Sequence, residues 1–587
     1  MDTYDVVVVG AGGAGMAAAA AAAQNGATVL VIEKMAEIGG NTIVAGGPFQ
    51  SAEPSLAWNP DDPEAAEAVY EVTGETVPKM KMDVGRLDTL RMILDWSEEP
   101  FDETVEDASA IKDVNDYRLP ERGVHAAYLP TLQTLKGQIR DYLKWADAKI
   151  KAGARETDLT LFSTIELHIF QTYYGGLRLN GGKDRWIASD FDLVKQMCEE
   201  ALNVKPWLIS QGSVFVNSMQ ITLIGCMWQR VNVMAGGVVD GQMYENKWGA
   251  YFMVPRNTLL SANEKNSIML RTTAKELMVE NGRVTGVKAV QHDGTEVEIT
   301  ANKGVIITTG GYAANVQMVM DTNDYWDEKY LTNRILTTNR NLSQGEGIVM
   351  GQAAGAGVVG MEWTQLMPLG WVDNGNLAGG TGENVIYISP AGTPNAGKRY
   401  VDEAAERDVL SQGAFDYGAE NGVYVEIANA GVEADPNFDQ SRVTVGTLSE
   451  VAALLEIDEE VLRQTITEYD AFIIGASDTP SQPAKSGYRG TIGDCEQDAN
   501  GNYLPETYKI GRLQVRFMAP STHHTMGGLT VDTGRHVLSA AGDVIPGLYA
   551  AGEVTGGFFA GNRLGANAIL EIIVSGKIAG ENAAKAQ

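Results

Sequence analysis

Cysteine is nearly absent from this 587-residue sequence. Its three thiols, Cys198, Cys226 and Cys495, lie far apart and form no CxxC pair. An odd number of isolated thiols argues against a disulfide framework and provides no zinc or iron–sulfur ligand set within the chain. The CxxCH motif that attaches haem is missing as well. We therefore expect three buried free thiols and no metal.

Basic charge is also scarce, because 45 lysines and arginines face 76 aspartates and glutamates, for a formal net charge of −31. This balance argues against nucleic acid or an anionic membrane surface as a partner. No run of residues approaches the ~18 apolar residues of a membrane span. The start at Met1 leaves no room for a signal peptide before the first predicted strand, so we expect a cytoplasmic location. If an export signal had been removed, the location would be periplasmic or extracytoplasmic.

Glycine, by contrast, is concentrated near the start of the chain. The apolar run Val6–Val9 predicts a buried parallel strand, and Ala17–Ala23 predicts a helix. Between them, Gly10 permits a tight turn, Gly12 lets the backbone approach a pyrophosphate, and Gly15 lets the helix pack closely on the strand. The free N–H groups of the helix N-terminus would then face the phosphates. This stretch predicts a dinucleotide site.

The residues that follow support the same site. A second predicted strand, Thr28–Ile32, ends at Glu33, where a carboxylate is placed to accept hydrogen bonds from a ribose diol. Two further glycine-rich segments, Gly39–Thr42 and Ala45–Gly47, would let backbone lie flat against a ring system. The glycine turn and the residues that follow it therefore both indicate a dinucleotide site.

The rest of the chain predicts one interrupted cofactor domain. Residues 1–361 and 521–587 would form it, because the end of the chain repeats the pattern of its start: a buried strand with glycines at 547–552, followed by a final helix at 566–584. Residues 53–230 predict a helical elaboration of this domain. Residues 362–520, richer in turns and carboxylates, predict an inserted second domain that is partly helical, with a helix start signal at Thr447–Glu450. Asn281–Gly282 and Asp293–Gly294 predict hairpin turns between antiparallel strands.

Four ordered motifs in addition to the glycine turn carry a family resemblance. They are Gly39–Thr42, His523–Gly528, Ala551–Glu553 and Gly561–Gly565. Together they resemble the flavoprotein subunits of the fumarate reductase and succinate dehydrogenase family, and most of all its soluble, single-subunit reductases of unsaturated acids. The likeness covers nearly the whole chain and is weakest over residues 53–230.

The resemblance implies an α/β fold: a Rossmann-like FAD-binding domain (GR2-type) with an inserted α+β capping domain that closes over the substrate. Membrane-bound members tether FAD through a histidine near the position of Asn41, so we expect noncovalent FAD here. The expected cofactor-binding residues are Gly10, Gly12, Gly13, Ala14, Gly15, Glu33, Lys34, Gly40, Asn41, Thr42, Gly46, Gly47, Ala274, Gly310, Gly311, Gly552, Glu553, Arg563, Ala566 and Ile569.

The resemblance also implies the chemistry, which is reduction of an activated C=C bond by hydride from flavin N5. His523 and Arg563 match the pair that binds and polarises a substrate carboxylate. A guanidinium group can form a bidentate hydrogen bond with a carboxylate, and this bond strengthens as negative charge grows on the carboxylate in the transition state. Arg407 matches the proton donor; arginine is normally a very weak acid, but the carbanion-like centre left by hydride addition is far more basic. The candidates for its reprotonation are Glu403, counted among the catalytic residues, and Glu406 and Glu383.

Two departures from the fumarate-type pattern predict a different substrate. Met367 stands where those members carry a histidine for the second carboxylate, and the region that holds their relay glutamate and arginine reads Gly380-Thr381-Gly382-Glu383-Asn384 here, without an arginine. A thioether cannot bind a carboxylate, and a buried unpaired charge costs several kcal/mol. We therefore expect an α,β-unsaturated carboxylate with a bulky or aromatic end rather than fumarate. The expected pocket comprises Met367, Phe559, Tyr387, His523, Arg563 and Gly528.

Two rival functions stay open. One is an FAD-dependent 3-ketosteroid dehydrogenase or enone reductase, in which a ketone activates the double bond. The other is a noncatalytic FAD-binding assembly partner. The sequence has no second dinucleotide fingerprint, so we expect electrons from a separate donor: reduced flavin, an FMN protein or a cytochrome.

Overall fold

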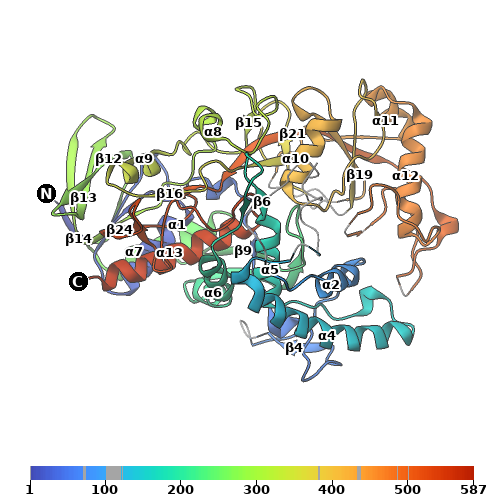
Figure 1. The fold of residues 1–587 in the computed structure, drawn as a ribbon, viewed down its shortest axis with the longest axis horizontal. Helices are drawn as coiled ribbons and strands as arrows, with labels where there is room; N and C mark the ends of the chain where they lie inside the picture. Colours follow the sequence, from blue (N-terminus) through green and yellow to red (C-terminus); the bar gives the residue numbers. More distant parts are fainter. Residues whose placement is uncertain are drawn as a thin grey trace.

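Both ends of the chain contribute strands to one eight-stranded mixed sheet (Figure 1). The computed structural model describes residues 2–70, 74–100, 121, 123–380, 384–432, 438–485, 487–488, 490–499 and 501–587. The strands of this sheet are β1 (Asp2–Val9), β2 (Val29–Ile32), β11 (Ser267–Met269), β12 (Thr272–Glu280), β13 (Arg283–Gln291), β14 (Glu296–Ile307), β23 (His536–Leu538) and β24 (Val544–Ala550).

The strand order in this sheet is β11-β2-β1-β14-β13-β12, with β24 beside β14 and β23 beside β24. Strand β1 runs parallel to β2 and β14, and the end of β14 runs parallel to β24. The apolar residues of β1 are buried, as expected for a strand covered on both faces. The turn between β12 and β13 has positive φ at Asn281 (+50°) and Gly282 (+78°), which confirms the predicted hairpin.

Helices from opposite ends of the chain pack against each other on this sheet. They are α1 (Gly13–Gln24) and α13 (Asn567–Lys585). A β-carbon on Gly576 would lie 2.4 Å from the Ala14 carbonyl oxygen, and one on Gly580 would lie 2.1 Å from the Ala18 carbonyl oxygen. The two helices are therefore closer than side chains at these positions would allow. Figure 1 shows both chain ends on this side of the molecule.

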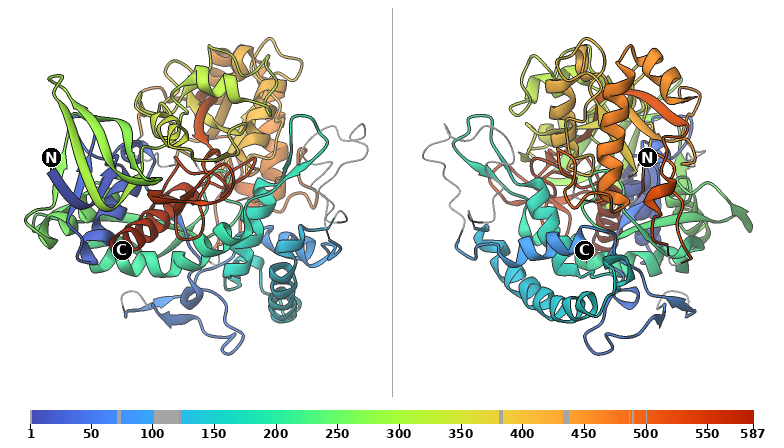
Figure 2. Two further views of the ribbon diagram at one scale, coloured as in Figure 1. Left: turned by 60° about the vertical axis from the view of Figure 1, so that its left-hand side comes forward. Right: turned by 90° about the vertical axis from the view of Figure 1, so that its right-hand side faces the viewer.

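The segment predicted as a helical elaboration contains helices and also strands. The helices are α2 (Arg86–Leu94), α4 (Leu129–Lys151), α5 (Ile165–Gly176) and α6 (Phe191–Ser210). The strands are β4 (Glu67–Val69), β5 (Thr76–Pro78), β6 (Arg178–Leu179), β7 (Trp186–Ile187) and β8 (Ser213–Ile221). Strand β8 pairs with β9 (Val231–Val239), which also pairs with β3 (Phe49–Gln50) and β10 (Gln242–Tyr244). In both views of Figure 2, the blue strands β4 and β5 of this segment lie at the lower edge of the molecule.

A six-stranded sheet occupies the middle of the chain. Its strands are β15 (Leu336–Thr337), β17 (Thr364–Trp371), β18 (Val385–Ile388), β19 (Tyr424–Asn429), β20 (Thr444–Gly446) and β21 (Leu513–Thr525). Helices α10 (Arg407–Tyr417), α11 (Leu448–Leu455) and α12 (Glu459–Ile473) accompany it. Helix α11 begins with the capping box expected from its sequence, because Thr447 and Glu450 each bind the other's backbone N–H.

Strand β21 crosses the predicted domain boundary between residues 520 and 521. Its first part pairs with β19, and at its end the backbone N–H of Thr525 donates to Glu553, in the loop that follows β24 (residues 551–553, the cofactor loop). The division into domains stays a prediction. The remaining elements are α7 (Ala250–Ala262), α8 (Val316–Thr322), α9 (Glu346–Ala353), and the pair β16 (Val358–Val359) and β22 (Gly528–Leu529).

The three cysteines are free, but only two are buried. Cys198 and Cys226 lie in the interior, whereas Cys495 is half-buried, because it lies in a loop after α12 rather than in a core. The prediction of three buried thiols is therefore wrong for Cys495. Among the residues that the structure describes, no group of His, Cys, Asp or Glu could hold a metal ion. No helix in these ranges is long and apolar enough to cross a membrane.

Candidate active site

The glycine turn after β1 forms one wall of an elongated cavity. Gly10 has φ of +105°, which a residue with a side chain rarely adopts. A β-carbon on Gly15 would lie 1.9 Å from the Gly10 carbonyl oxygen, so this glycine lets α1 pack on the turn. A β-carbon on Gly12 would have no neighbour closer than 3.9 Å. The side-chain space at Gly12 is therefore open to a ligand, and no side chain caps α1.

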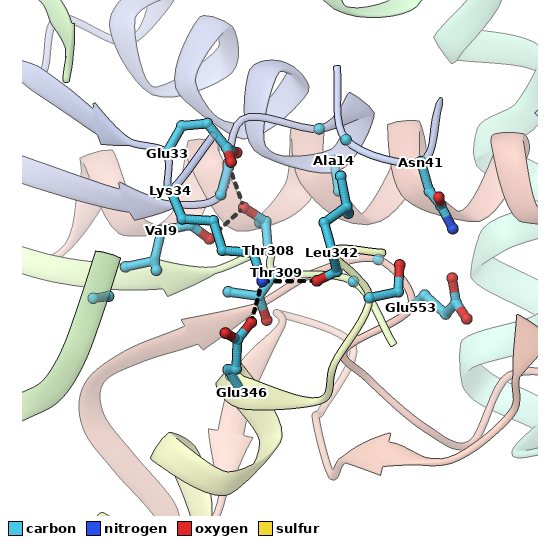
Figure 3. Close-up of a pocket in the computed structure, with 18 of the residues that line it drawn as sticks. Val9, Ala14, Glu33, Lys34, Asn41, Thr308, Thr309, Leu342, Glu346 and Glu553 are labelled. Atoms are coloured by element: carbon cyan, nitrogen blue, oxygen red, sulfur yellow. Dashed lines mark hydrogen bonds and ion pairs between the residues drawn. The ribbon is translucent and has the colours of Figure 1, made fainter. Parts of the chain in front are cut away.

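The two ends of the cavity carry different groups (Figure 3). At one end, the Glu33 carboxylate accepts hydrogen bonds from the backbone N–H groups of Ala11 (2.9 Å) and Met35 (2.8 Å). Beside it, Lys34 donates to the Leu342 carbonyl at 2.8 Å and pairs with Glu346. Asn41 and Glu553 lie at the other end.

Most of the predicted cofactor residues line this cavity. Those that do are Gly10, Gly12, Gly13, Ala14, Glu33, Lys34, Gly40, Asn41, Thr42, Ala274, Gly310, Gly552 and Glu553. Those outside its lining are Gly15, Gly46, Gly47, Gly311, Arg563, Ala566 and Ile569.

Sequence reasoning missed several lining residues that lie beyond the glycine motifs: Val9, Ile32, Thr272, Thr273, Thr308, Thr309, Leu342, Ser343, Glu346, Gly347, Met350, Ala551 and Ile572. Thr308 and Thr309 follow directly on β14 and precede a glycine pair, so their place at the end of a parallel strand was a usable signal.

A cluster of basic side chains lies beside the Asn41 and Glu553 end. Arg407 is the first residue of α10, His523 and His524 lie near the end of β21, and Arg563 lies in the loop before α13. Both arginines are more than nine-tenths buried. Arg407 and Glu553 are close enough to Arg563 for their charges to shift its pKa. The structure therefore brings the three predicted basic catalytic residues together.

The two arginines have little hydrogen bonding among the described residues. Arg407 donates to Gln365 Oε1 at 3.4 Å, and Arg563 donates to the Leu564 carbonyl at 3.1 Å. The Nε atoms of both guanidinium groups are buried without a partner. Buried polar groups are normally satisfied, so this cluster is suited to an anion that can accept from both arginines.

Burial and mutual repulsion shape the charges of the cluster. Burial lowers the pKa of Arg407 to about 10. Burial, and then the charge of Arg407, hold the pKa of Arg563 well below its usual value. Burial, and then the two arginines, lower the pKa of His523 well below 6.5, so this imidazole is neutral near pH 7. Burial raises the pKa of Glu553 to about 7, against the hydrogen bonds from Thr525 and the charge of Arg563.

Gln365 is a site residue that sequence reasoning missed. Its Nε2 donates to Asn562 Oδ1 at 2.8 Å and to the Arg563 carbonyl at 2.6 Å, while its Oε1 accepts from Arg407. One amide thus connects the segments that carry the two arginines. Its signal was its position two residues before Met367, inside a segment already compared with the family.

Glu403 is paired with cations other than Arg407. Its carboxylate forms a two-pronged ion pair with Arg399, at 2.8 and 2.6 Å, and lies 3.8 Å from Lys485 Nζ. It also accepts from the backbone N–H of Tyr387. Glu406 directly precedes Arg407 and lines a cleft of about 960 Å³. The third relay candidate, Glu383, lies outside the described residues.

The predicted substrate-pocket residues fall in two groups. Met367 and Tyr387 belong to one buried apolar cluster with Ile224, and Met367 is 1% exposed. Phe559 belongs to a different apolar cluster, and its ring centroid lies 5.7 Å from that of His524. Gly528 lies in β22, where a β-carbon would meet the Val554 carbonyl at 2.2 Å. Gly528 therefore permits close backbone packing beside the cofactor loop.

A family model described as "FAD binding domain" matches residues 5–79 and 131–569. The chain belongs to this FAD-binding family. Its cofactor is FAD, and the cavity fits that cofactor, because the glycine turn, the uncapped helix and Glu33 line one continuous pocket. The predicted α/β fold with its FAD-binding domain is confirmed.

Two relatives of this FAD-binding protein are reductases by name. It is 33% identical to an NADH:acrylate oxidoreductase of Vibrio harveyi over 99% of this chain and 50% of that protein. It is 28% identical to a urocanate reductase of Eggerthella lenta over 67% of this chain and 62% of that protein. The chain thus spans between half and two thirds of the length of these relatives.

Two solved structures share the fold across the whole chain. One is the open conformation of a flavocytochrome c3 fumarate reductase, with 20% identity, a TM-score of 0.57 and 78% of that chain covered. The other is a 3-ketosteroid-Δ4-(5α)-dehydrogenase from Rhodococcus jostii RHA1, with 18% identity, a TM-score of 0.56 and 97% of that chain covered. The fold alone therefore does not distinguish an enoate from a steroid as substrate.

Proposed function

We propose that this flavoprotein is an oxidoreductase that reduces the activated C=C bond of an α,β-unsaturated carboxylate. The observation that carries the proposal is the pair of buried arginines beside the FAD cavity, Arg407 and Arg563, whose Nε atoms have no partner among the described residues. A carboxylate could accept from these donors and would offset one of the two positive charges. A neutral ketone would leave two buried cations uncompensated, which disfavours the steroid alternative.

Three side chains divide the chemistry between them. When bound, FAD supplies a hydride from N5 to one carbon of the double bond. Arg563 and His523 bind the substrate carboxylate and stabilise the charge that grows on it as the hydride arrives. Arg407 donates a proton to the neighbouring carbon. Its pKa of about 10 makes it a stronger acid than an exposed arginine, while it stays protonated at neutral pH.

Reprotonation of Arg407 is assigned to Glu406 rather than to Glu403. Glu406 adjoins Arg407 and lines the large cleft, which supplies water and protons. Glu403 already neutralises Arg399 and Lys485 in the interior. Breaking such a buried ion pair is strongly unfavourable, so a proton-carrying role for Glu403 is disfavoured.

The substrate has one carboxylate and a bulky or aromatic end. Met367, buried among apolar side chains, offers nothing to a second carboxylate, and Phe559 provides an aromatic surface beside His524. The names of the two relatives support the single carboxylate, since acrylate and urocanate are both unsaturated monocarboxylates. Only urocanate, which carries an imidazole ring, has a bulky end.

FAD is bound without a covalent link, and its electrons come from a separate donor. Asn41, at the position of the tethering histidine, uses its side chain in hydrogen bonds with Asn339 and the backbone N–H of Arg340. We expect acid precipitation to release all the yellow colour into the supernatant. Colour that stays in the protein pellet would contradict a noncovalent cofactor.

The decisive experiment follows reoxidation of the reduced holoprotein. Protein reduced with dithionite under anaerobic conditions would be mixed with cinnamate, urocanate, fumarate or an enone steroid while flavin absorbance is recorded. Rapid reoxidation by the monocarboxylates is expected, with fumarate slow and the steroid inert. Reoxidation by the steroid alone would establish the steroid rival. Reoxidation by none of them would favour the noncatalytic assembly partner.

A further inference from the structure

Thr338 holds the imidazole of His523. Strand β15 runs parallel to β21 with Thr337 opposite Thr522, and the backbone N–H of Thr338 continues the ladder by donating to the Thr522 carbonyl at 2.9 Å. This register places Thr338 beside His523. Thr338 Oγ1 lies 2.6 Å from His523 Nδ1, and Thr338 is more than nine-tenths buried.

The direction of this hydrogen bond decides what the other ring nitrogen can do. A neutral imidazole has one N–H donor and one acceptor nitrogen. His523 is neutral because burial and the two arginines oppose its protonation. If Nδ1 carried the proton, Nε2 would be an acceptor, and its lone pair would repel a carboxylate. If Nε2 carries the proton, it can donate to one.

The partners of Thr338 favour donation by its hydroxyl group. Asn339 Nδ2 approaches Thr338 Oγ1 at 3.5 Å and therefore supplies a donor to that oxygen. The Thr522 carbonyl, 3.3 Å from Thr338 Oγ1, already accepts from the Thr338 backbone and from Thr337 Oγ1. The hydroxyl hydrogen of Thr338 is thus best used in the shorter contact with His523 Nδ1.

We propose that Thr338 is a positioning residue that fixes the tautomer of His523 with the proton on Nε2, so that Nε2–H is a donor to the substrate carboxylate. Nε2 has no hydrogen-bond partner among the described residues, whereas Nδ1 has Thr338. The role toward a carboxylate rests on the proposed function; the tautomer does not.

Asn339 connects this arrangement to the FAD cavity. Its Nδ2 donates to the His523 carbonyl at 2.8 Å, and its Oδ1 accepts from Asn41, which lines the cavity. The backbone and the ring of His523 are therefore both held by the pair Thr338–Asn339. This pair would orient His523 before any substrate arrives.

The test combines a spectroscopic readout with binding. The FAD-loaded protein, labelled with ¹⁵N-histidine, would be compared with Thr338→Val, which removes the hydroxyl at constant shape, and Thr338→Ser, which keeps it. The signals of His523 are identified by their loss in His523→Gln. The matched control is Thr337→Val, because the Thr337 hydroxyl bonds the Ala313 and Thr522 carbonyls and not His523.

We expect wild-type His523 to show the ¹⁵N shifts of the Nε2–H tautomer, and Thr338→Val to lose that preference. The affinity for 3-phenylpropionate, a saturated monocarboxylate, should fall about tenfold in Thr338→Val and change less than about twofold in Thr338→Ser and Thr337→Val. A wild-type His523 protonated on Nδ1, or a Thr338→Val protein with unchanged tautomer and affinity, would overturn the proposal. Failure of the proposed function would appear differently, as Nε2–H shifts in a protein that binds no carboxylate.

Discussion

Replacing Met367 with histidine should turn this protein toward dicarboxylates. Met367 is 1% exposed and packs in an apolar cluster with Ile224 and Tyr387. A second carboxylate bound against this cluster would be a buried charge without a partner, at a cost of about 3–5 kcal/mol. Since 1.36 kcal/mol corresponds to a factor of ten in rate, fumarate should react roughly 150- to 5,000-fold less efficiently than a cinnamate-type acid.

A histidine at this position restores a donor for the second carboxylate. A hydrogen bond to a charged group contributes about 1.5–3 kcal/mol, so Met367→His should raise kcat/KM for fumarate roughly 10- to 150-fold. The matched control is Met367→Leu, an apolar replacement of similar volume that should leave the fumarate to cinnamate ratio unchanged. Because the new imidazole lies in an apolar cluster, we also expect a lower Tm for Met367→His than for Met367→Leu.

The assay is anaerobic stopped-flow reoxidation of reduced FAD by each acid, with kcat/KM obtained from the concentration dependence. Two results would refute the reasoning. One is a wild-type protein that reduces fumarate and cinnamate with similar efficiency. The other is a Met367→His protein that holds FAD and reduces cinnamate but gains nothing with fumarate.

Three further predictions concern the proton donor, the glycine turn and a buried carboxylate. Arg407→Ala should lower turnover roughly 10²- to 10⁴-fold while FAD absorbance is retained, and full activity would remove Arg407 from the mechanism. Gly12→Ala should fold but bind FAD poorly, because its methyl group meets no protein atom closer than 3.9 Å and enters the ligand space. Gly15→Ala should instead lower Tm, because its methyl group would lie 1.9 Å from the Gly10 carbonyl oxygen. Equal FAD content in both variants would contradict this distinction. Burial raises the pKa of the Asp470 carboxyl group from 3.8 to about 6, so the folded state binds this proton more tightly than the unfolded state does. The resulting stabilisation is complete below pH 3.8, and the free energy of unfolding falls by about 3 kcal/mol as the pH rises through about 6. The urea midpoint should therefore decline over this range in the wild type and lose that slope in Asp470→Asn.

Local chemistry is what the sequence predicts well here. The glycine turn, the Asn281–Gly282 hairpin and the Thr447 capping box each depend on residues within a few positions of one another, and the structure contains all three. The family resemblance also predicts that residues distant in the sequence share one site. It relates His523, Arg407 and Arg563, and these residues lie close together in the structure.

Contacts between distant segments are what the sequence does not reveal. Glu403 is a relay candidate from its place in the family segment that ends near Arg407, but Arg399 and Lys485 compete for its carboxylate. The role of Thr338 depends on the register of a two-residue strand, which has no periodicity to detect. Likewise, β8 lies in a segment whose helices dominate its pattern, and it pairs with β9 just beyond that segment.

The contact between α1 and α13 has a consequence for biosynthesis. These helices come from residues 13–24 and 567–585, yet glycines in α13 fit against the backbone of α1. At roughly 5–20 residues per second, a ribosome needs about half a minute to two minutes to translate the chain between them. During that time the nascent phosphate-binding turn lacks its covering helix, and its alanine-rich surface is exposed to the cytosol or to chaperones. Because Gly552, Glu553 and Ile572 also line the cavity, we expect the complete FAD site to form only after α13 has been translated.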